Sequence, residues 1–111
     1  MKIKQIYFKI MIRITDRINL LSKSCMIGDY DLAKFCIEHS DIDLKNDNQF
    51  IENAGYYGYY DIVELLLEHG ANPEGSGAVL LTSKVRCHYK THNLLKTYTR
   101  KNKLNKIISL I

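Results

Sequence analysis

The chain has 111 residues, of which 46% are hydrophobic and 25% are charged, so it has the size and composition of one small folded domain. Wholesale disorder is excluded, and we expect no membrane span because the uncharged apolar runs are only a few residues long. The net charge of +4 hides three blocks: five basic residues and one acid in 1–17 (+4), three basic and eleven acidic in 18–83 (−8), and eight basic and no acidic in 84–111 (+8).

The first predicted element is the basic and apolar segment 1–18. Its apolar residues alternate over 6–14, as in a strand, and they also fit one face of a helix over 3–14. We favour a capping helix, because an isolated strand would leave its backbone groups unpaired. Four cations interrupt residues 1–14 and no small-residue cleavage site follows, so we do not expect a secretory signal.

Two copies of one pattern follow, offset by 30 residues. Residues 28–39 (GDYDLAKFCIEH) align with residues 58–69 (GYYDIVELLLEH), and five of the twelve pairs are identical. The differences are mild at the positions where burial is expected, such as Phe35 and Leu65. This period predicts a helical repeat array, in which each unit buries its apolar face against a neighbour.

The second copy predicts two short helices and a loop. The first helix covers Phe50–Tyr57 and ends at Gly58, which accepts the left-handed conformation. Asp61 opens the second helix, where a carboxylate suits the positive end of the helix dipole. A broad apolar face that includes Leu66 follows, and the helix ends at Gly70, after which Asn72 and Pro73 turn the chain outward.

Residues 58–73 (GYYDIVELLLEHGANP) resemble the second half of an ankyrin repeat, with its I/V-V-x-L-L-L helix and G-A-D/N close. The first copy is a degenerate version in which Ser40 replaces the closing glycine. The family's T-P-L-H signature falls on residues 49–52, where only Ile51 fits, and its Gly-His pair is Gly58-Tyr59. Such drift is similar to the ankyrin arrays of large DNA viruses and some intracellular bacteria.

The C-terminal region predicts a third, degenerate unit. Ala78–Cys87 fits an inner helix and Asn93–Tyr98 an outer one, with Thr91-His92 near the Gly-His position, but two registers remain open. A separate closing helix is predicted by four apolar residues at helical spacing: Leu104, Ile107, Ile108 and Ile111.

The residue types that carry chemistry predict structural roles. Cys25 and Cys36 fall where small buried residues are expected, and no base and orienting group accompany either thiol. His39 and His69 recur at the end of each outer helix, where a cation favours the dipole. Cys87, His88 and His92 lack a fourth ligand for a structural zinc site. We therefore expect no enzyme, no metal and no cofactor.

The cluster Tyr56-Tyr57-Gly58-Tyr59-Tyr60 combines large contact area with hydroxyl groups. For Tyr59 and Tyr60 we favour packing between repeats, as at the equivalent Tyr30. For Tyr56 and Tyr57, packing and partner binding remain equally open.

These observations predict an all-α, short ankyrin-type stack: an N-terminal cap (1–18), a degenerate repeat (19–47), a clear repeat (48–77), and a degenerate repeat with a basic cap (78–111). The resemblance implies a protein-binding module without catalysis, in the cytoplasm, whose binding surface carries over by position to Asp47, Asn48, Gln49, Glu52, Tyr56 and Tyr57. The acidic character of this surface favours a basic partner. The alternative is an adaptor that binds nucleic acid or an anionic membrane through residues 84–111.

Overall fold

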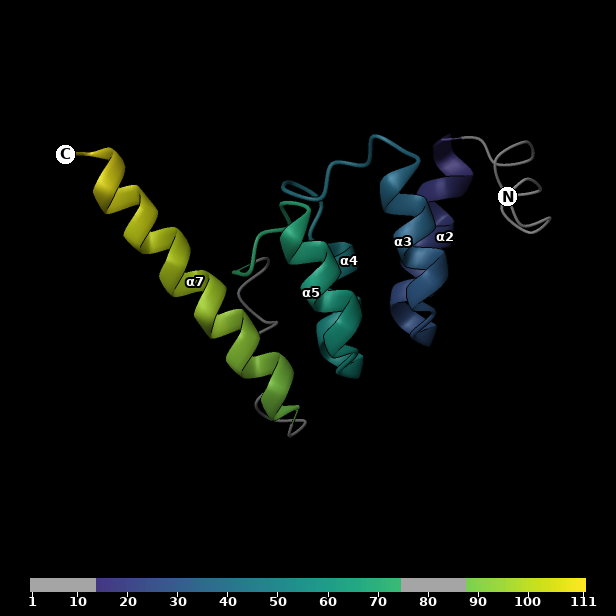
Figure 1. The fold of residues 1–111 in the computed structure, drawn as a ribbon. Helices are drawn as coiled ribbons and strands as arrows, with labels where there is room; N and C mark the ends of the chain where they lie inside the picture. Colours follow the sequence, from purple (N-terminus) through teal and green to yellow (C-terminus); the bar gives the residue numbers. More distant parts are fainter. Residues whose placement is uncertain (1–13, 75–87) are drawn as a thin grey trace.

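The computed structural model describes residues 14–74 and 88–111. Within these ranges the protein contains helices and no strand, and the helices are α2 (Ile14–Ile27), α3 (Tyr30–Glu38), α4 (Gln49–Tyr57), α5 (Tyr60–Glu68) and α7 (Tyr89–Ser109). Figure 1 shows α2 beside α3, α4 beside α5, and the longer α7 beyond α5. The prediction of an all-α stack of paired helices is confirmed. The helix expected at Ala78–Cys87 lies outside the described residues, as does the chain before Ile14.

The first helix pair forms because each end of its outer helix has a local cap. Helix α2 begins at Ile14, inside the segment that the sequence assigned to an N-terminal cap. The Asp29 carboxylate accepts a hydrogen bond from the Leu32 backbone N–H at 3.1 Å, which caps the start of α3. At the other end, the Ser40 hydroxyl donates to the carbonyl oxygen of Cys36. Ser40 therefore satisfies an end carbonyl at the position where a glycine would normally close the helix.

The second pair follows the predicted boundaries closely. Gly58 has φ 74° and ends α4 in the left-handed conformation, and the Tyr59 N–H donates to the Ala54 carbonyl at 3.0 Å. Helix α5 then begins at Tyr60, with Asp61 in its first turn. His69 caps its C-terminus and Gly70 follows at φ 97°. Gly58 and Gly70 thus provide the two chain reversals that the sequence predicted.

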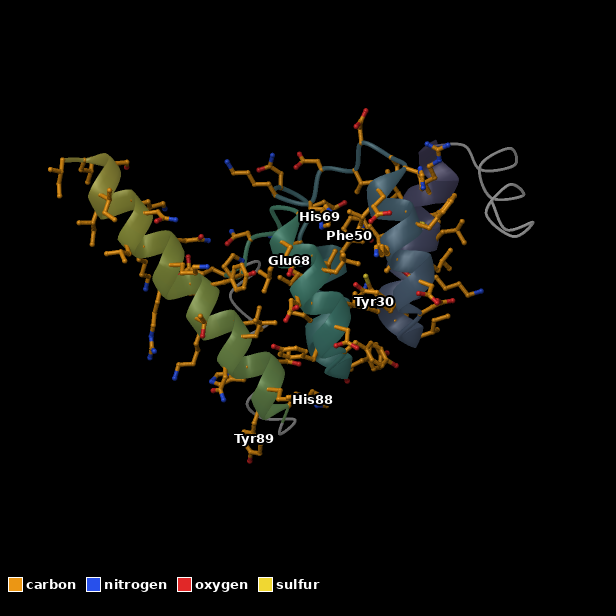
Figure 2. The ribbon with its side chains drawn as sticks, in the orientation of Figure 1. Tyr30, Phe50, Glu68, His69, His88 and Tyr89 are labelled. Atoms are coloured by element: carbon orange, nitrogen blue, oxygen red, sulfur yellow. The ribbon has the colours of Figure 1, made fainter. Side chains whose placement is uncertain are left out.

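The core lies between the helix pairs. Helix α2 packs on both α3 and α4, and α5 packs on α3, α4 and α7. Figure 2 shows Phe50, which is 1% exposed, between the two pairs. The side chains around it are aliphatic or small, and the fully buried ones include Leu21, Cys25, Ala33, Cys36, Ala54, Val63 and Leu66. The apolar faces predicted for the two copies therefore form one continuous core.

The C-terminal prediction of two separate helices is wrong. Residues from Tyr89 to Ser109 form the single helix α7, because no glycine or proline interrupts them. Its first half packs against the stack through Thr91, Leu95 and Thr99, which are buried. Every residue from Arg100 to Ile111 is exposed. Only about half of α7 thus belongs to the stack.

A repeated contact fixes the register of the last unit. A Cβ atom added to Gly28 would lie 2.6 Å from the Tyr59 ring, and one added to Gly58 would overlap the His88 ring. Tyr59 precedes α5 just as His88 precedes α7, so His88 occupies the position of Tyr59 in the next unit. Of the registers that the sequence left open, this contact favours one in which His88, and not His92, aligns with Tyr59.

Candidate functional site

The predicted binding residues lie along α4 and the loop that precedes it. Helix α4 has nine residues, which span about 13 Å along the helix axis. Gln49, Glu52 and Tyr56 follow at intervals of three and four residues, so they form one line along the helix, opposite its buried face of Phe50 and Ile51. Tyr57 contacts Tyr56 at the C-terminal end of the helix. We refer to Asp47, Asn48, Gln49, Glu52, Tyr56 and Tyr57 together as the α4 surface.

The N-terminal end of the α4 surface is held by hydrogen bonds among its own residues. The Asp47 carboxylate accepts from the Gln49 side-chain amide at 2.9 Å and from the Gln49 backbone N–H at 3.3 Å. The Glu52 backbone N–H donates to the Asn48 carbonyl at 3.0 Å. Asn48 Oδ1 is buried and has no hydrogen-bond partner. The structure therefore brings four of the predicted residues together at the first turn of α4.

The C-terminal end of the α4 surface is aromatic. Tyr56 and Tyr57 are 44% and 40% exposed, and their rings meet edge to face with centroids 4.9 Å apart. The Tyr57 ring also stacks on Tyr59 at 6.1 Å, and Tyr59 in turn packs over Gly28. The prediction that Tyr59 packs between repeats is confirmed. Tyr56 and Tyr57 present area to solvent from a pre-ordered cluster, which lowers the entropic cost of using them in an interface.

The tyrosines at the starts of the outer helices differ from one another. Tyr30 is 38% exposed, so more of its side chain reaches solvent than at Tyr59 and Tyr60, which are half-buried. Tyr60 is half-buried, and the Lys90 ammonium of α7 lies 5.1 Å from the centre of its ring. A hydrogen bond with Glu64, followed by burial, raises the pKa of Tyr60. Tyr60 thus contacts α7, which agrees with the packing role that the sequence favoured for it.

The loop between the two repeats is acidic and has local hydrogen bonds. The Asp43 carboxylate accepts from the Asn46 side chain at 2.9 Å and from its backbone N–H at 3.1 Å, and these bonds lower the pKa of Asp43. Asp41 and Asp43 are both exposed. The loop therefore adds negative charge beside the start of α4, which agrees with the acidic character predicted for this side.

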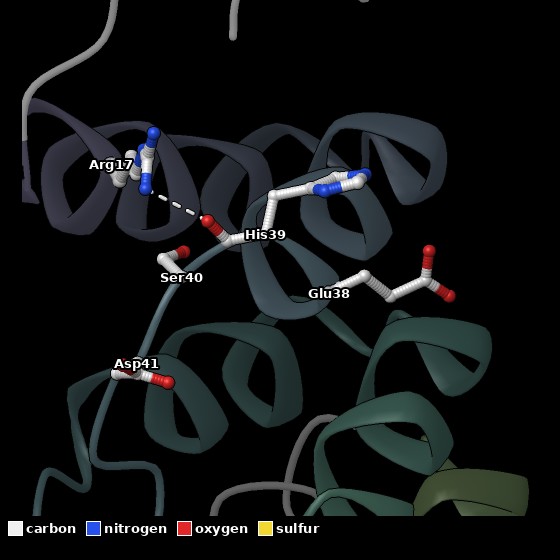
Figure 3. A pocket seen from close by; sticks show the side chains of 5 residues that line it. All are labelled: Arg17, Glu38, His39, Ser40 and Asp41. Carbon is white, nitrogen blue, oxygen red and sulfur yellow. Dashed lines mark hydrogen bonds between the residues drawn. The ribbon is translucent and has the colours of Figure 1, made fainter.

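Sequence reasoning missed the role of Arg17. Its guanidinium donates to the carbonyl oxygen of His39 at 2.8 Å, as Figure 3 shows, and so places a cation at the negative end of α3. The two residues line a shallow cleft of about 340 Å³ with Glu38, Ser40 and Asp41. The sequence gives little indication of this contact, because the partner of Arg17 is a backbone carbonyl 22 residues away. We assign the cleft no ligand.

The two described cysteines have the properties of core residues. Cys25 and Cys36 are free thiols with 0% exposure, so the prediction that they pack as small hydrophobes is confirmed. Burial raises the pKa of Cys25 to about 12 and that of Cys36 to about 11. Because the thiolate is the reactive form, neither thiol is poised as a nucleophile at neutral pH.

These pKa values predict slow thiol chemistry in the folded protein. In a Cys87→Ser variant at pH 8, we expect Ellman's reagent to modify Cys25 and Cys36 only after denaturation. The free energy of unfolding should also fall as the pH rises above 9, because the unfolded thiols then lose protons that the folded ones keep. Rapid modification of both thiols in the native protein would contradict this assignment.

The other residue groups considered in the sequence gain no binding role. His69 Nδ1 lies 2.9 Å from the Leu65 carbonyl, and the His39 ring packs 4.6 Å from the Phe35 ring. Among the described residues, no group of three or more His, Cys, Asp or Glu side chains is placed to hold a metal ion. Cys87 lies outside the described residues. In the described ranges, no helix is both long enough and apolar enough to cross a membrane.

The comparisons with known proteins agree with this repeat geometry. The family model described as Ankyrin repeat matches residues 53–76. No curated protein and no solved structure matches the chain. The match begins within α4, includes all of α5 and continues into the turn around Pro73. Residues 53–76 thus match an ankyrin repeat, in agreement with the resemblance of residues 58–73.

Proposed function

We propose that the protein is a non-catalytic interaction module that binds a protein partner through the α4 surface. The ankyrin repeat is generally a protein-interaction unit, and residues 53–76 match it. The observation that carries the assignment to this surface is the pre-ordered cluster of Tyr56 and Tyr57, exposed at one end of a line of polar residues on α4. Exposed tyrosines of this kind are common anchors of interfaces.

The charge of this side supports a basic partner. Residues 18–83 carry eleven acids and three basic residues, and Asp43 and Asp47 lie in the loop beside α4. A basic patch would be steered toward this side and would meet Glu52 next to the tyrosines. The proposal places the encounter in the cytoplasm, the host cytoplasm if the source is a virus, where buried reduced thiols such as Cys25 and Cys36 are normal.

The test is a pull-down from the native cell followed by a comparison of variants. Glu52→Ala combined with Tyr57→Ala should weaken the retained partner at least 30-fold, because a central aromatic anchor contributes about 2 kcal/mol or more to binding. Both side chains lie on the protein surface, so thermal unfolding should change little.

Tyr30→Ala is the matched control for the tyrosine substitution. Tyr30 is 38% exposed and Tyr57 is 40% exposed, but Tyr30 belongs to the outer helix α3 and not to α4. The control should retain the partner at its original affinity. Equal losses from both variants would show that the α4 surface is not the binding surface.

A further inference from the structure

The second half of α7 carries an unusual set of exposed side chains. Leu104, Ile107 and Ile108 are 55%, 58% and 57% exposed, and Ile111 is fully exposed. These residues recur at intervals of three, one and three, which places them on one side of a helix. Leu110, at the C-cap, keeps helical dihedral angles, so Ile111 continues this side. We call Leu104, Ile107, Ile108 and Ile111 the outer stripe.

The outer stripe points away from the domain. The side of α7 that faces the stack contains the buried Thr91, Leu95 and Thr99. Further along the helix, Asn102, Asn105, Lys106 and Ser109 line an open cleft of about 490 Å³ together with residues 45–46, 70–72 and 74. At about 100° of rotation per residue, the outer stripe lies about 180° from this side. The second half of α7 therefore turns its polar side to its own domain and its apolar side to the surroundings, the reverse of an ordinary surface helix.

Cations border the outer stripe on both sides. Lys101 and Lys103 flank it, and Arg100 lies in line with it one turn earlier. Lys103 approaches Glu74 at 3.9 Å, but both side chains are more than half exposed, so this ion pair contributes little and leaves the lysine accessible. Residues 84–111 contain eight basic residues and no acid. Whatever covers the stripe must therefore accept aliphatic groups and positive charge together.

The combination of aliphatic side chains and positive charge distinguishes between the candidate partners. Nucleic acid would use the cations but would leave four aliphatic side chains unburied. A second copy paired through the same helix would bring the cations of both copies together and would be opposed by their repulsion. Binding in a protein groove usually relies on aromatic anchors, whereas the outer stripe contains only Leu and Ile. An anionic bilayer accepts aliphatic side chains at its acyl boundary and cations at its headgroups.

We propose that residues 100–111 lie in the interface of a bilayer that contains anionic phospholipid. Leu104, Ile107, Ile108 and Ile111 enter the acyl boundary, and Arg100, Lys101 and Lys103 contact headgroup phosphates. The helix lies on the membrane and does not cross it. Since the stack packs on the opposite side of α7, the domain and its α4 surface remain in solvent. This proposal is independent of the one made for the α4 surface.

The test is flotation of the full chain with vesicles of phosphatidylcholine, with and without phosphatidylserine. We expect binding only to the vesicles that contain phosphatidylserine. Ile107→Ser with Ile108→Ser should reduce that binding at least tenfold, because two aliphatic side chains no longer enter the acyl boundary. Met26→Ser with Ile27→Ser is the matched control, since these residues are 46% and 57% exposed at the end of α2, and it should bind like the original protein.

A second variant tests the charges. Lys101→Gln with Lys103→Gln should weaken binding about fivefold for each lysine removed, and added salt should weaken the binding of the original protein. Thermal unfolding of each variant should match that of the original protein, because residues 100–111 are exposed.

Four results would overturn the proposal. The first is absence of flotation, and the second is binding that survives the isoleucine substitutions and is lost with the lysines, which would show attraction by charge alone. The third is tighter binding to duplex DNA than to vesicles, which would assign the cations to nucleic acid. The last is a dimer, detected by light scattering without lipid, that dissociates when the isoleucines are substituted. Such a dimer would assign the outer stripe to a second copy.

Discussion

Leu66→Ala is expected to lower the free energy of unfolding by about 2–5 kcal/mol. Leu66 has 0% exposure and lies in the core shared by the helix pairs, so the smaller side chain leaves a cavity that the neighbouring helices cannot fully close. A small domain has about 5–15 kcal/mol of total stability, so this loss should leave the protein close to unfolding at 37 °C. Urea denaturation followed by circular dichroism measures the change.

Leu104→Ala is the control for this substitution. Leu104 is 55% exposed on α7, so its replacement should change the free energy of unfolding by less than about 0.5 kcal/mol. If the two variants unfold at the same urea concentration, Leu66 does not hold the repeats together.

Gly58→Ala should destabilise the protein more than Gly70→Ala does. Both glycines have positive φ, 74° and 97°, so alanine costs about 1–2 kcal/mol at either position. Only at Gly58 would the new Cβ also overlap the His88 ring, whereas no atom lies within 4 Å of the corresponding position at Gly70. Overpacking of this kind adds about 1–3 kcal/mol. The difference between the two variants measures the contact between the last two units.

A double variant isolates that contact. His88→Ala removes the ring, so Gly58→Ala should cost less in the presence of His88→Ala than alone, and the remaining cost should approach that of Gly70→Ala. A double-mutant cycle by urea denaturation gives the coupling energy. If the two substitutions are additive, His88 does not dock on Gly58 and the register of the last unit must be revised.

The two central helices and the turns that bound them could be predicted from local sequence alone. Gly58 and Gly70 end α4 and α5 because their backbones adopt positive φ, which depends on the residue itself. The apolar residues of 50–67 recur with the helical period, so the buried face followed from spacing alone. Cys25 and Cys36 were placed in the core by their positions in the repeat, which the family resemblance implied.

The α4 surface was predicted in part. Its residues were chosen by position in the repeat, and the line from Gln49 to Tyr56 follows from helical spacing. The sequence favoured packing for Tyr59 and Tyr60 and left Tyr56 and Tyr57 open. Tyr59 is held over Gly28, while Tyr30, at the start of α3, remains exposed. The packing of Tyr59 depends on Gly28, which lies 31 residues earlier along the chain.

Only the tertiary structure decided how the C-terminal region is used. Periodicity defined an apolar side of residues 104–111, but it could not state whether that side would meet the stack. Because Thr91, Leu95 and Thr99 dock α7 on the stack, the rotation of the whole helix is set, and the outer stripe must face away. Likewise, only the contact between His88 and Gly58 indicated how the last unit aligns with the one before it. Local sequence specifies helices and their faces, whereas packing between distant segments decides which faces are covered.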